Sequence, residues 1–187
     1  MDERKWIERI LAGDTQSFSC LVAKYEKMAY TIALRILENR KEAEEAVQDA
    51  FVKMYRALSD FHFDSKFSTW FYRIVYRTAL TALRQQRMFV SYEEAGPVDL
   101  SNDEVESATA LLEREDRKEM IARTLKKLPA DEALLLTLYY LEECSVEEIC
   151  QITELSASNV KVKLFRGRKR FYEVLQDKMK LETADLL

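Results

Sequence analysis

Glycine and proline are scarce in this sequence, with 3 and 2 occurrences among 187 residues. Tight turns and strand boundaries rely on these two residue types, so few positions favour hairpins. Hydrophobic residues make up 48% of the chain, which is enough to bury a core. We therefore predict long helices with few breaks, and an all-α fold.

The first block of helical pattern runs from Trp6 to about Arg87. Asn39 suits the end of one helix, and the acidic run from Glu42 suits the start of the next. Residues 59–68 break the pattern and are predicted to form a loop before a helix over 69–87. Apolar residues at steps of three and four in this block are Leu21, Tyr25, Met28, Ile32, Ile36, Ala43, Ala46, Val47, Ala50, Phe51, Met54, Tyr55 and Leu58.

Residues 91–116 differ in composition from the rest, because they hold nine acidic residues against one base, Arg114. They also contain Gly96-Pro97, and from about Val105 they could become helical. Self-repulsion among the acids favours a flexible linker. We predict two small helical domains, residues 1–90 and 117–187, joined by this acidic linker.

The C-terminal block contains the signature of a helix-turn-helix. Leu128-Pro129 predicts a helix boundary, since a residue before proline avoids the helical region. Ser145 and Ser156 each suit a helix start. A short helix over 146–152, a turn over 153–156 and a longer basic helix then follow.

Two of the predicted helices carry basic faces. The helix over 69–87 has an apolar side, formed by Phe71, Val75, Ala79 and Ala82, and a basic side opposite to it. No acidic residue occurs from Lys66 to Tyr92. Arginine binds phosphates, and an exposed tryptophan can stack on an unpaired base. The alternative is that the tryptophan is a core residue and the arginines are solvated or paired. The residues of the basic side are Trp70, Arg73, Arg77, Thr81 and Arg84.

The last helix has the same division. Val160, Leu164 and Phe171 point inward, and Gly167 on that side allows a close backbone approach. Asn159 could pair with adenine, and Lys161 or Lys163 with guanine. A helical hairpin with a solvated basic face is the alternative. The outward and flanking residues are Asn159, Lys161, Lys163, Arg166, Arg168, Lys169 and Arg170.

Charge and composition exclude several classes of protein. A net charge of −4 does not exclude nucleic-acid binding, because local charge decides it. No apolar run approaches the ~18 residues of a membrane span, and the charged N-terminus lacks a signal-peptide core, so a cytoplasmic protein is expected. Cys20, Cys144 and Cys150 read as free thiols, and His62 is the only histidine. With no phosphate loop, nucleophile elbow or metal cluster, we expect no metal, no cofactor and no enzyme.

Three segments resemble the extracytoplasmic-function (ECF) sigma factors of bacterial RNA polymerase, in the sigma-70 superfamily. Residues 39–51 (NRKEAEEAVQDAF) resemble the core-polymerase-binding helix of region 2. Residues 67–74 (FSTWFYRI) resemble its promoter-melting and −10 segment. Residues 125–129 (LKKLP), 145–150 (SVEEIC) and 159–168 (NVKVKLFRGR) resemble region 4, the −35 helix-turn-helix. The resemblance covers nearly the whole chain.

The resemblance implies a dissociable initiation subunit that binds core RNA polymerase and promoter DNA and is monomeric when free. The loop over 59–66 would hold a flipped −10 base, and the linker would thread toward the active-site and RNA-exit channels. The implied polymerase-binding residues are Glu45, Gln48, Asp49 and Val52. The implied −10 and melting residues are His62, Lys66, Phe67, Thr69, Trp70, Arg73, Arg77 and Arg84. The implied −35 residues are Ser158, Asn159, Lys161, Lys163, Arg166 and Arg170.

The sequence departs from the family at a few positions. Arg77 stands where family members often carry asparagine, Thr81 where they often carry aspartate or asparagine, and Cys150 where alanine is common. Glu154 replaces a frequent glycine of the region 4 turn. Because glutamate disfavours the left-handed conformation, we expect a different turn there, with a carboxylate that repels DNA.

Family members are commonly held by an anti-sigma factor, often a membrane-anchored one, and such a partner is expected here. A flexible linker would leave the DNA and polymerase surfaces of the free protein open. The competing hypothesis is an operator-binding regulator whose N-terminal half senses or dimerises. The basic helix over 69–87 and the acidic helix over 42–58 speak against it, since a repressor has no need to hold single strands.

Overall fold

The computed structural model of the protein describes residues 3–90 and 112–184, with side chains described for 3–86 and 119–177. Across these two ranges the chain forms eight α-helices, one 3-10 helix and no strand, which confirms the all-α fold. None of these helices is long and apolar enough to cross a membrane. The elements are α1 (Glu3–Leu11), α2 (Gln16–Leu37), α3 (Arg40–Arg56), η1 (Leu58–Asp60), α4 (Phe67–Val90), α5 (Leu112–Lys126), α6 (Ala130–Tyr140), α7 (Val146–Thr153) and α8 (Ala157–Ala184).

The predicted linker falls mostly outside the described part of the chain. Residues 91–111 lie outside the described residues, and residues 112–116 form the start of α5. The domain limits at 90 and 116 stay predictions. Below, α1–α4 are called the first lobe and α5–α8 the second lobe.

Local chemistry sets the helix ends in the first lobe. Asn39 is the N-cap of α3, and its side chain accepts a hydrogen bond from the Glu42 backbone N–H at 3.2 Å. The preceding residue, Glu38, closes α2 in the left-handed conformation with φ 55°. The predicted break at Asn39 is therefore confirmed in place, although Asn39 begins α3 rather than ending α2. Helix α4 begins at Phe67, two residues before the predicted start.

The core of the first lobe is rich in aromatic rings. Tyr25 of α2 lies 5.4 Å from Phe67 and 5.9 Å from Phe71 of α4, centroid to centroid. Phe51 of α3 lies 4.8 Å from Phe71. These rings are nearly fully buried, and tilted or edge-on pairs of this kind stabilise a core beyond the area they bury. They fix α4 against α2 and α3, which determines the face that α4 turns outward.

The second lobe contains the predicted helix-turn-helix. Ser145 and Glu148 form a capping box at the start of α7, with the Ser145 hydroxyl accepting from Glu148 N and the Glu148 carboxylate accepting from Ser145 N. The Ser156 hydroxyl accepts from Asn159 N at 3.3 Å at the start of α8. Both predicted helix starts, and the break at Leu128-Pro129 between α5 and α6, are confirmed.

Helix α8 crosses α6 closely at Gly167. A Cβ atom there would lie 3.2 Å from Leu136 Cδ1 and 3.3 Å from Glu132 Cβ. The glycine therefore serves the close approach that the sequence predicts.

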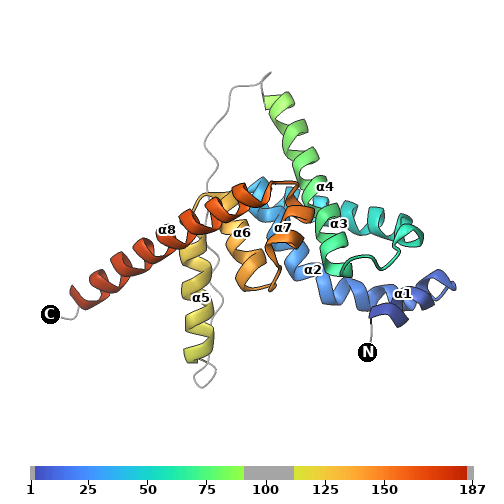
Figure 1. The fold of residues 1–187 in the computed structure, drawn as a ribbon, viewed down its shortest axis with the longest axis horizontal. Helices are drawn as coiled ribbons and strands as arrows, with labels where there is room; N and C mark the ends of the chain where they lie inside the picture. The colour runs from blue at the N-terminus through green and yellow to red at the C-terminus, as the bar shows by residue number, and fades with distance from the viewer. Residues whose placement is uncertain (1–2, 91–111, 185–187) are drawn as a thin grey trace.

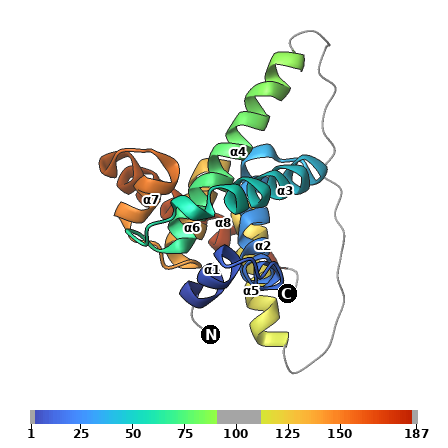
Figure 2. The same cartoon turned by 90° about the vertical axis from the view of Figure 1, so that its right-hand side faces the viewer.

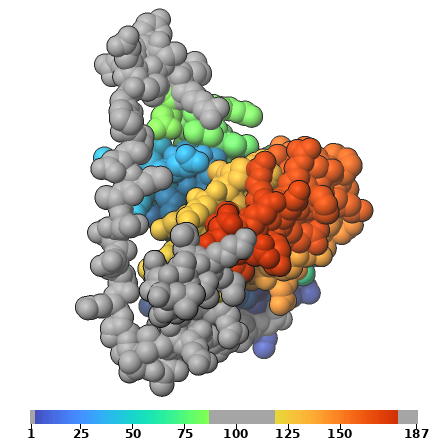
Figure 3. Space-filling view, turned by 90° about the vertical axis from the view of Figure 1, so that its left-hand side faces the viewer, coloured from blue at the N-terminus to red at the C-terminus, as the bar shows by residue number. Residues whose placement is uncertain are grey.

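The two lobes pack against each other. Helix α7 lies against α4, and α6 lies against α2 (Figures 1 and 2). Buried apolar residues of both lobes belong to one continuous cluster. In Figure 3 the gold part of the second lobe sits against the blue α2 of the first lobe. The described residues thus form one closed body.

Candidate nucleic-acid interface

Helix α4 has the two faces that the sequence predicts. Phe71, Val75 and Ala79 are fully buried in the first lobe. The opposite side is exposed and basic, and it bears Arg73, Arg77, Thr81 and Arg84. Because packing fixes α4 on its apolar side, the arginines project from a rigid support.

Two residues at the N-terminal end of α4, Phe67 and Trp70, are more buried than their predicted roles require. Phe67 is only 3% exposed and belongs to the aromatic core, so the prediction that it contacts DNA is wrong for this conformation. Trp70 is half-buried, with its ring 5.1 Å from Phe61 and 5.6 Å from Phe67. Trp70 therefore packs on the aromatic core and stays partly exposed.

The loop before α4 holds the other predicted −10 residues. His62 is exposed, and its Nδ1 lies 2.6 Å from the Asp60 carbonyl oxygen. Lys66 is also exposed, but its ammonium pairs at 3.0 Å with Glu148 of the second lobe. Thr69 is buried, with its hydroxyl 3.5 Å from the same carboxylate.

Two arginines of the basic face of α4 pair with the second lobe, although their side chains stay about half exposed. Glu154 Oε1 accepts from Arg77 Nε at 2.9 Å and from Arg73 Nη2 at 3.3 Å. Hydrogen bonds from Arg77 and then Arg73 hold the pKa of Glu154 below its ordinary value. The expectation that the free protein leaves its DNA surfaces open is therefore wrong for α4, because a carboxylate occupies its arginines.

The turn of the helix-turn-helix differs from what the sequence predicts at Glu154. We expected glutamate to change it, yet Glu154 adopts the left-handed conformation that a glycine would use, with φ 62° and ψ 17°. The conformation is disfavoured for residues with a Cβ. It is closed here by the Glu154 N–H donating to the Cys150 carbonyl at 2.8 Å. The turn keeps its geometry, and the half-exposed side chain reaches Arg73 and Arg77 of α4.

Helix α8 presents the predicted reading face only in part. Ser158, Asn159, Lys161 and Arg166 are exposed. Lys163 instead pairs with Asp131 at the start of α6.

Arg170 of α8 pairs in the same way with α6. Its guanidinium donates to Glu132 Oε1 at 3.0 Å. Glu132 is 5% exposed, and its second oxygen is buried without a hydrogen-bond partner. Arg170 therefore compensates a buried charge, which ties it to the lobe.

Sequence reasoning missed two apolar residues on α8. Val162 and Phe165 are 46% and 66% exposed among the basic residues of this face. Our interpretation followed charge alone, whereas an apolar residue at an outward helical position was the available signal. Apolar side chains can contact the methyl group of thymine.

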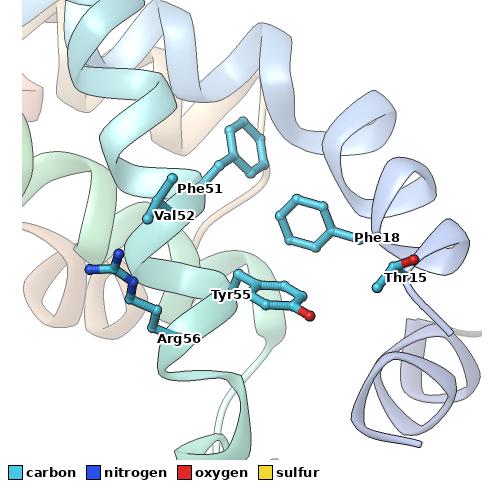
Figure 4. Close-up of a pocket in the computed structure, with 6 residues that line it drawn as sticks. All are labelled: Thr15, Phe18, Phe51, Val52, Tyr55 and Arg56. Carbon is cyan, nitrogen blue, oxygen red and sulfur yellow. The ribbon is translucent and has the colours of Figure 1, made fainter. Parts of the chain in front are cut away.

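Helix α3 offers a different surface. Glu45, Gln48, Asp49 and Val52 are all exposed and share one face, as their spacing predicts. Beside them lies a shallow groove of about 470 Å³. Figure 4 shows Phe18 at the start of α2 facing Tyr55 of α3 across it, with ring centroids 5.1 Å apart. Tyr55 is 45% exposed, so this residue of the predicted apolar stripe lines the surface rather than the core.

The remaining reactive groups form no centre. Over the described residues, no group of three or more His, Cys, Asp or Glu side chains could hold a metal ion. Cys20 is an exposed free thiol, Cys144 a buried one and Cys150 a partly buried one. Burial raises the pKa of the Cys144 thiol to about 11.

Comparison with known proteins matches both lobes. The family profile of Sigma-70 region 2 covers residues 21–88, and that of Sigma-70, region 4 covers residues 118–171. The RNA polymerase sigma-H factor of Pseudomonas aeruginosa is 32% identical, over 93% of this chain and 94% of that protein. The ECF RNA polymerase sigma-E factor of Escherichia coli is 31% identical, over 87% and 88%.

Solved structures share the fold. The sigma factor RpoE of Bartonella quintana, in complex with the anti-sigma factor NepR, superposes with a TM-score of 0.70 at 18% identity. It covers 87% of this chain and 98% of that one. CnrH, in complex with the cytosolic domain of CnrY, gives 0.61 at 21% identity, over 94% and 97%. With both sigma-70 regions in order and relatives above 30% identity along almost its whole length, the chain belongs to the ECF group of the sigma-70 family, the sigma factors that direct RNA polymerase to promoters.

Proposed function

We propose that three surfaces of this sigma factor divide the recognition of a promoter. The outward face of α3 binds core RNA polymerase, the basic face of α4 holds the −10 region, and the exposed face of α8 reads the −35 element. The observation that carries the proposal is the pair of acid-free basic helix faces on separate lobes of one sigma-70 chain. Two such faces suit a grip on two separated DNA elements.

The −35 surface is the exposed part of α8. Ser158, Asn159, Lys161 and Arg166 are accessible near the N-terminal half of a helix that follows a tight turn. In a helix-turn-helix those positions meet base edges in the major groove. We add Phe165, whose exposed ring suits a thymine methyl group. Lys163 and Arg170 become DNA contacts only if they exchange Asp131 and Glu132 for phosphate.

The −10 surface consists of α4 and the loop before it. Arg73, Arg77 and Arg84 suit phosphates, and the accessible part of Trp70 suits a separated base. His62 and Lys66 are exposed in the loop that would hold a flipped base. Phe67 supports these residues from the core.

The polymerase surface combines acids with exposed apolar residues. Glu45, Gln48 and Asp49 surround Val52, and the Phe18–Tyr55 groove lies alongside. Exposed apolar residues bordered by polar ones are typical of protein interfaces. Most of the promoter affinity then comes from the assembled polymerase.

We propose further that this chain performs no chemistry itself, is monomeric when free and works in the cytoplasm with the polymerase. We also propose an anti-sigma partner, because the RpoE of Bartonella quintana, which shares this fold, was solved with one. Purification of the tagged chain from unstressed cells, with mass spectrometry of what copurifies, tests this. Recovery of polymerase without any stoichiometric small protein would count against the partner.

Run-off transcription with purified core polymerase on a library of upstream regions tests the main proposal. We expect discrete transcripts that vanish without the chain. Operator binding of high affinity without polymerase, and no promoter-dependent transcript, would favour the repressor alternative.

The −35 assignment has its own variants. Lys161→Ala or Arg166→Ala should cost about 1–3 kcal/mol where the contact is to a base. Where the lost contact is to a phosphate, the substitution should lower the slope of log affinity against log salt concentration by about one. Lys5→Ala, which removes an exposed charge from α1, is the matched control.

A further inference from the structure

Glu154 links the two candidate DNA surfaces. It belongs to the turn between α7 and α8, yet its carboxylate accepts hydrogen bonds from Arg77 and Arg73 of α4. A phosphate group would occupy the same two guanidinium groups in the same way, because arginine binds both anions through paired N–H donors. The turn thus places a carboxylate where the −10 surface needs a phosphate.

A second carboxylate repeats the pattern about two helical turns away, seven residues before Arg73. Glu148 of α7 pairs with Lys66 at 3.0 Å and contacts the Thr69 hydroxyl. Nearby, the Tyr72 hydroxyl donates to Glu142 Oε2 at 2.7 Å. Three acids of the second lobe therefore follow α4 over about 16 Å, at a rise of about 1.5 Å per residue from Lys66 to Arg77.

Composition explains why α4 attracts these acids. No acidic residue occurs between Lys66 and Tyr92, so the basic face cannot be neutralised from within its own helix. The ion pairs are exposed and contribute little individually. The apolar cluster shared by both lobes supplies the attraction, and the acids select the position in which α7 docks.

We propose that the free chain is closed on itself: α7 and the turn after it occupy the basic face of α4, with Glu154 and Glu148 in the places of DNA phosphates. The inference rests on the proposed −10 function of α4. It assigns a regulatory role to Glu154, the residue at which the chain departs from the glycine of its family.

The closed form blocks one DNA surface and leaves the other available. Arg73 and Arg77 are engaged, whereas Ser158, Asn159 and Arg166 of α8 remain exposed. The free chain should therefore bind duplex DNA through α8 while it binds single strands weakly. Polymerase must separate the lobes before α4 can hold an opened −10 region.

The test measures shape and single-strand binding on the full chain. Glu154→Gln removes the charge, and Glu154→Lys places a repelling cation against Arg73 and Arg77. Glu173→Gln and Glu173→Lys are matched controls, because Glu173 is exposed on α8 and, among the residues whose side chains are described, its ion pair is with Lys169 of the same helix at 3.9 Å. The radius of gyration comes from small-angle X-ray scattering. The affinity comes from fluorescence anisotropy with a labelled pool of random 12-nucleotide single strands.

Opening should enlarge the Glu154 variants and strengthen single-strand binding relative to the Glu173 controls. The gain reaches about tenfold if the open form is on the order of a tenth of wild-type molecules, because apparent affinity scales with the competent fraction. Adding Arg77→Gln to Glu154→Lys should abolish most of that gain, since it places the strands on α4.

The possible failures are distinguishable. If the Glu154 variants match the Glu173 controls in size and affinity while Arg77→Gln alone weakens binding, α4 binds DNA but the closure is refuted. If the Glu154 variants expand without binding strands more tightly, and Arg77→Gln has no effect, the −10 assignment fails and the inference fails with it.

Discussion

Gly167 has little space around it. Its Cβ position lies 3.2 Å from Leu136 Cδ1 and 3.3 Å from both Leu136 Cγ and Glu132 Cβ. A side chain there would push α8 away from α6, and the outward face of α8 would tilt with it. The close crossing of these helices thus depends on one missing methyl group.

We predict that Gly167→Val destabilises the protein by about 1–3 kcal/mol, the usual cost of overpacking. Gly167→Ala is the control: alanine gains about 1 kcal/mol of helix propensity. That gain offsets contacts that are only a few tenths of an ångström too short, so alanine should stay within about 1 kcal/mol of wild type. Urea unfolding measures both. Equal stability of the two variants would contradict the close crossing.

Ser145 is the second residue on which the second lobe depends. Its hydroxyl and the Glu148 carboxylate satisfy two backbone N–H groups at the start of α7. Ser145→Ala should cost about 1 kcal/mol of stability. Ser59→Ala, at an exposed serine of η1, is the matched control and should be neutral in the same thermal unfolding measurement. A Ser145 variant as stable as the control would show that the cap is dispensable.

At the residue scale, the sequence predicted helix starts well and burial less well. Ser145 and Ser156 are confirmed because a cap is a local interaction over three residues. Phe67 was placed with the DNA residues because it begins the segment that resembles the family's −10 region. Its burial depends on the ring of Tyr25 in α2, which is distant in sequence, and on that of Phe61 just after η1.

Glu154 shows the opposite kind of limit. Its intrinsic preference argued against a left-handed turn, yet it adopts one. The pairing with Arg73 and Arg77 across the lobes accompanies this conformation, and sequence separation hides it. Local propensity is only a prior that tertiary contacts can override.

At the scale of elements, α4 combines a buried apolar face with an exposed basic one, and Trp70 lies at their border. Sequence periodicity predicted both faces correctly, because each residue of a helix turns by about 100° and its position in the sequence therefore decides its face. It could not assign Trp70, which packs on Phe61 and Phe67 yet stays partly exposed.

We predict that Trp70→Ala impairs promoter opening by the holoenzyme, because a stacked base loses about 1–3 kcal/mol. Duplex binding through α8 should be unchanged. Ile74→Ala, a half-buried change on the same helix, controls for lost packing. Permanganate reactivity of unpaired thymines reports opening. If both variants open the promoter equally, Trp70 is a core residue only.

Helix α3 is the element for which the polymerase prediction is sharpest. Val52 is 47% exposed, one turn after Gln48 and Asp49, and it lines the Phe18–Tyr55 groove. Val52→Asp should weaken binding to core polymerase by more than about 1 kcal/mol, as expected for a central interface residue. Leu11→Asp, at a 53% exposed residue of α1, is the control. Comparable losses in both, measured by competition for core polymerase, would move the interface away from α3.

At the scale of the whole molecule, the position of one lobe on the other was beyond sequence reasoning. Arg77 and Glu154 are 77 residues apart, and Tyr72 and Glu142 are 70 apart. Their pairing leaves no periodic signal, and single exposed ion pairs are too weak to predict from charge. The fold class and both basic faces followed from the sequence, whereas the pairing of Arg73 and Arg77 with the other lobe depends on the tertiary structure.

Acidification should open this closed molecule. Hydrogen bonds from Arg77 and Arg73 lower the pKa of Glu154 from its ordinary 4.5. Burial raises the pKa of Glu148, but hydrogen bonds from Ser145 N and Lys66 outweigh it, so the net shift is also downward. A carboxylate with a lower pKa in the closed form stabilises that form fully above pH 4.5. The contribution is lost as the pH falls through the closed-form value.

We therefore predict that the radius of gyration is constant from pH 7 to about 5 and increases below about pH 4.5, before the helices unfold. Small-angle scattering measures the size, and far-ultraviolet circular dichroism confirms intact helices. In Glu148→Gln/Glu154→Gln the two carboxylates no longer titrate, so the protein should already be expanded at pH 7 and respond less to acid. Glutamine at position 148 keeps an oxygen for Ser145 N, which preserves the cap. An identical acid response in both proteins would show that other groups open the molecule, since these two acids are the carboxylates that bind the cations of α4 across the lobes among the described residues.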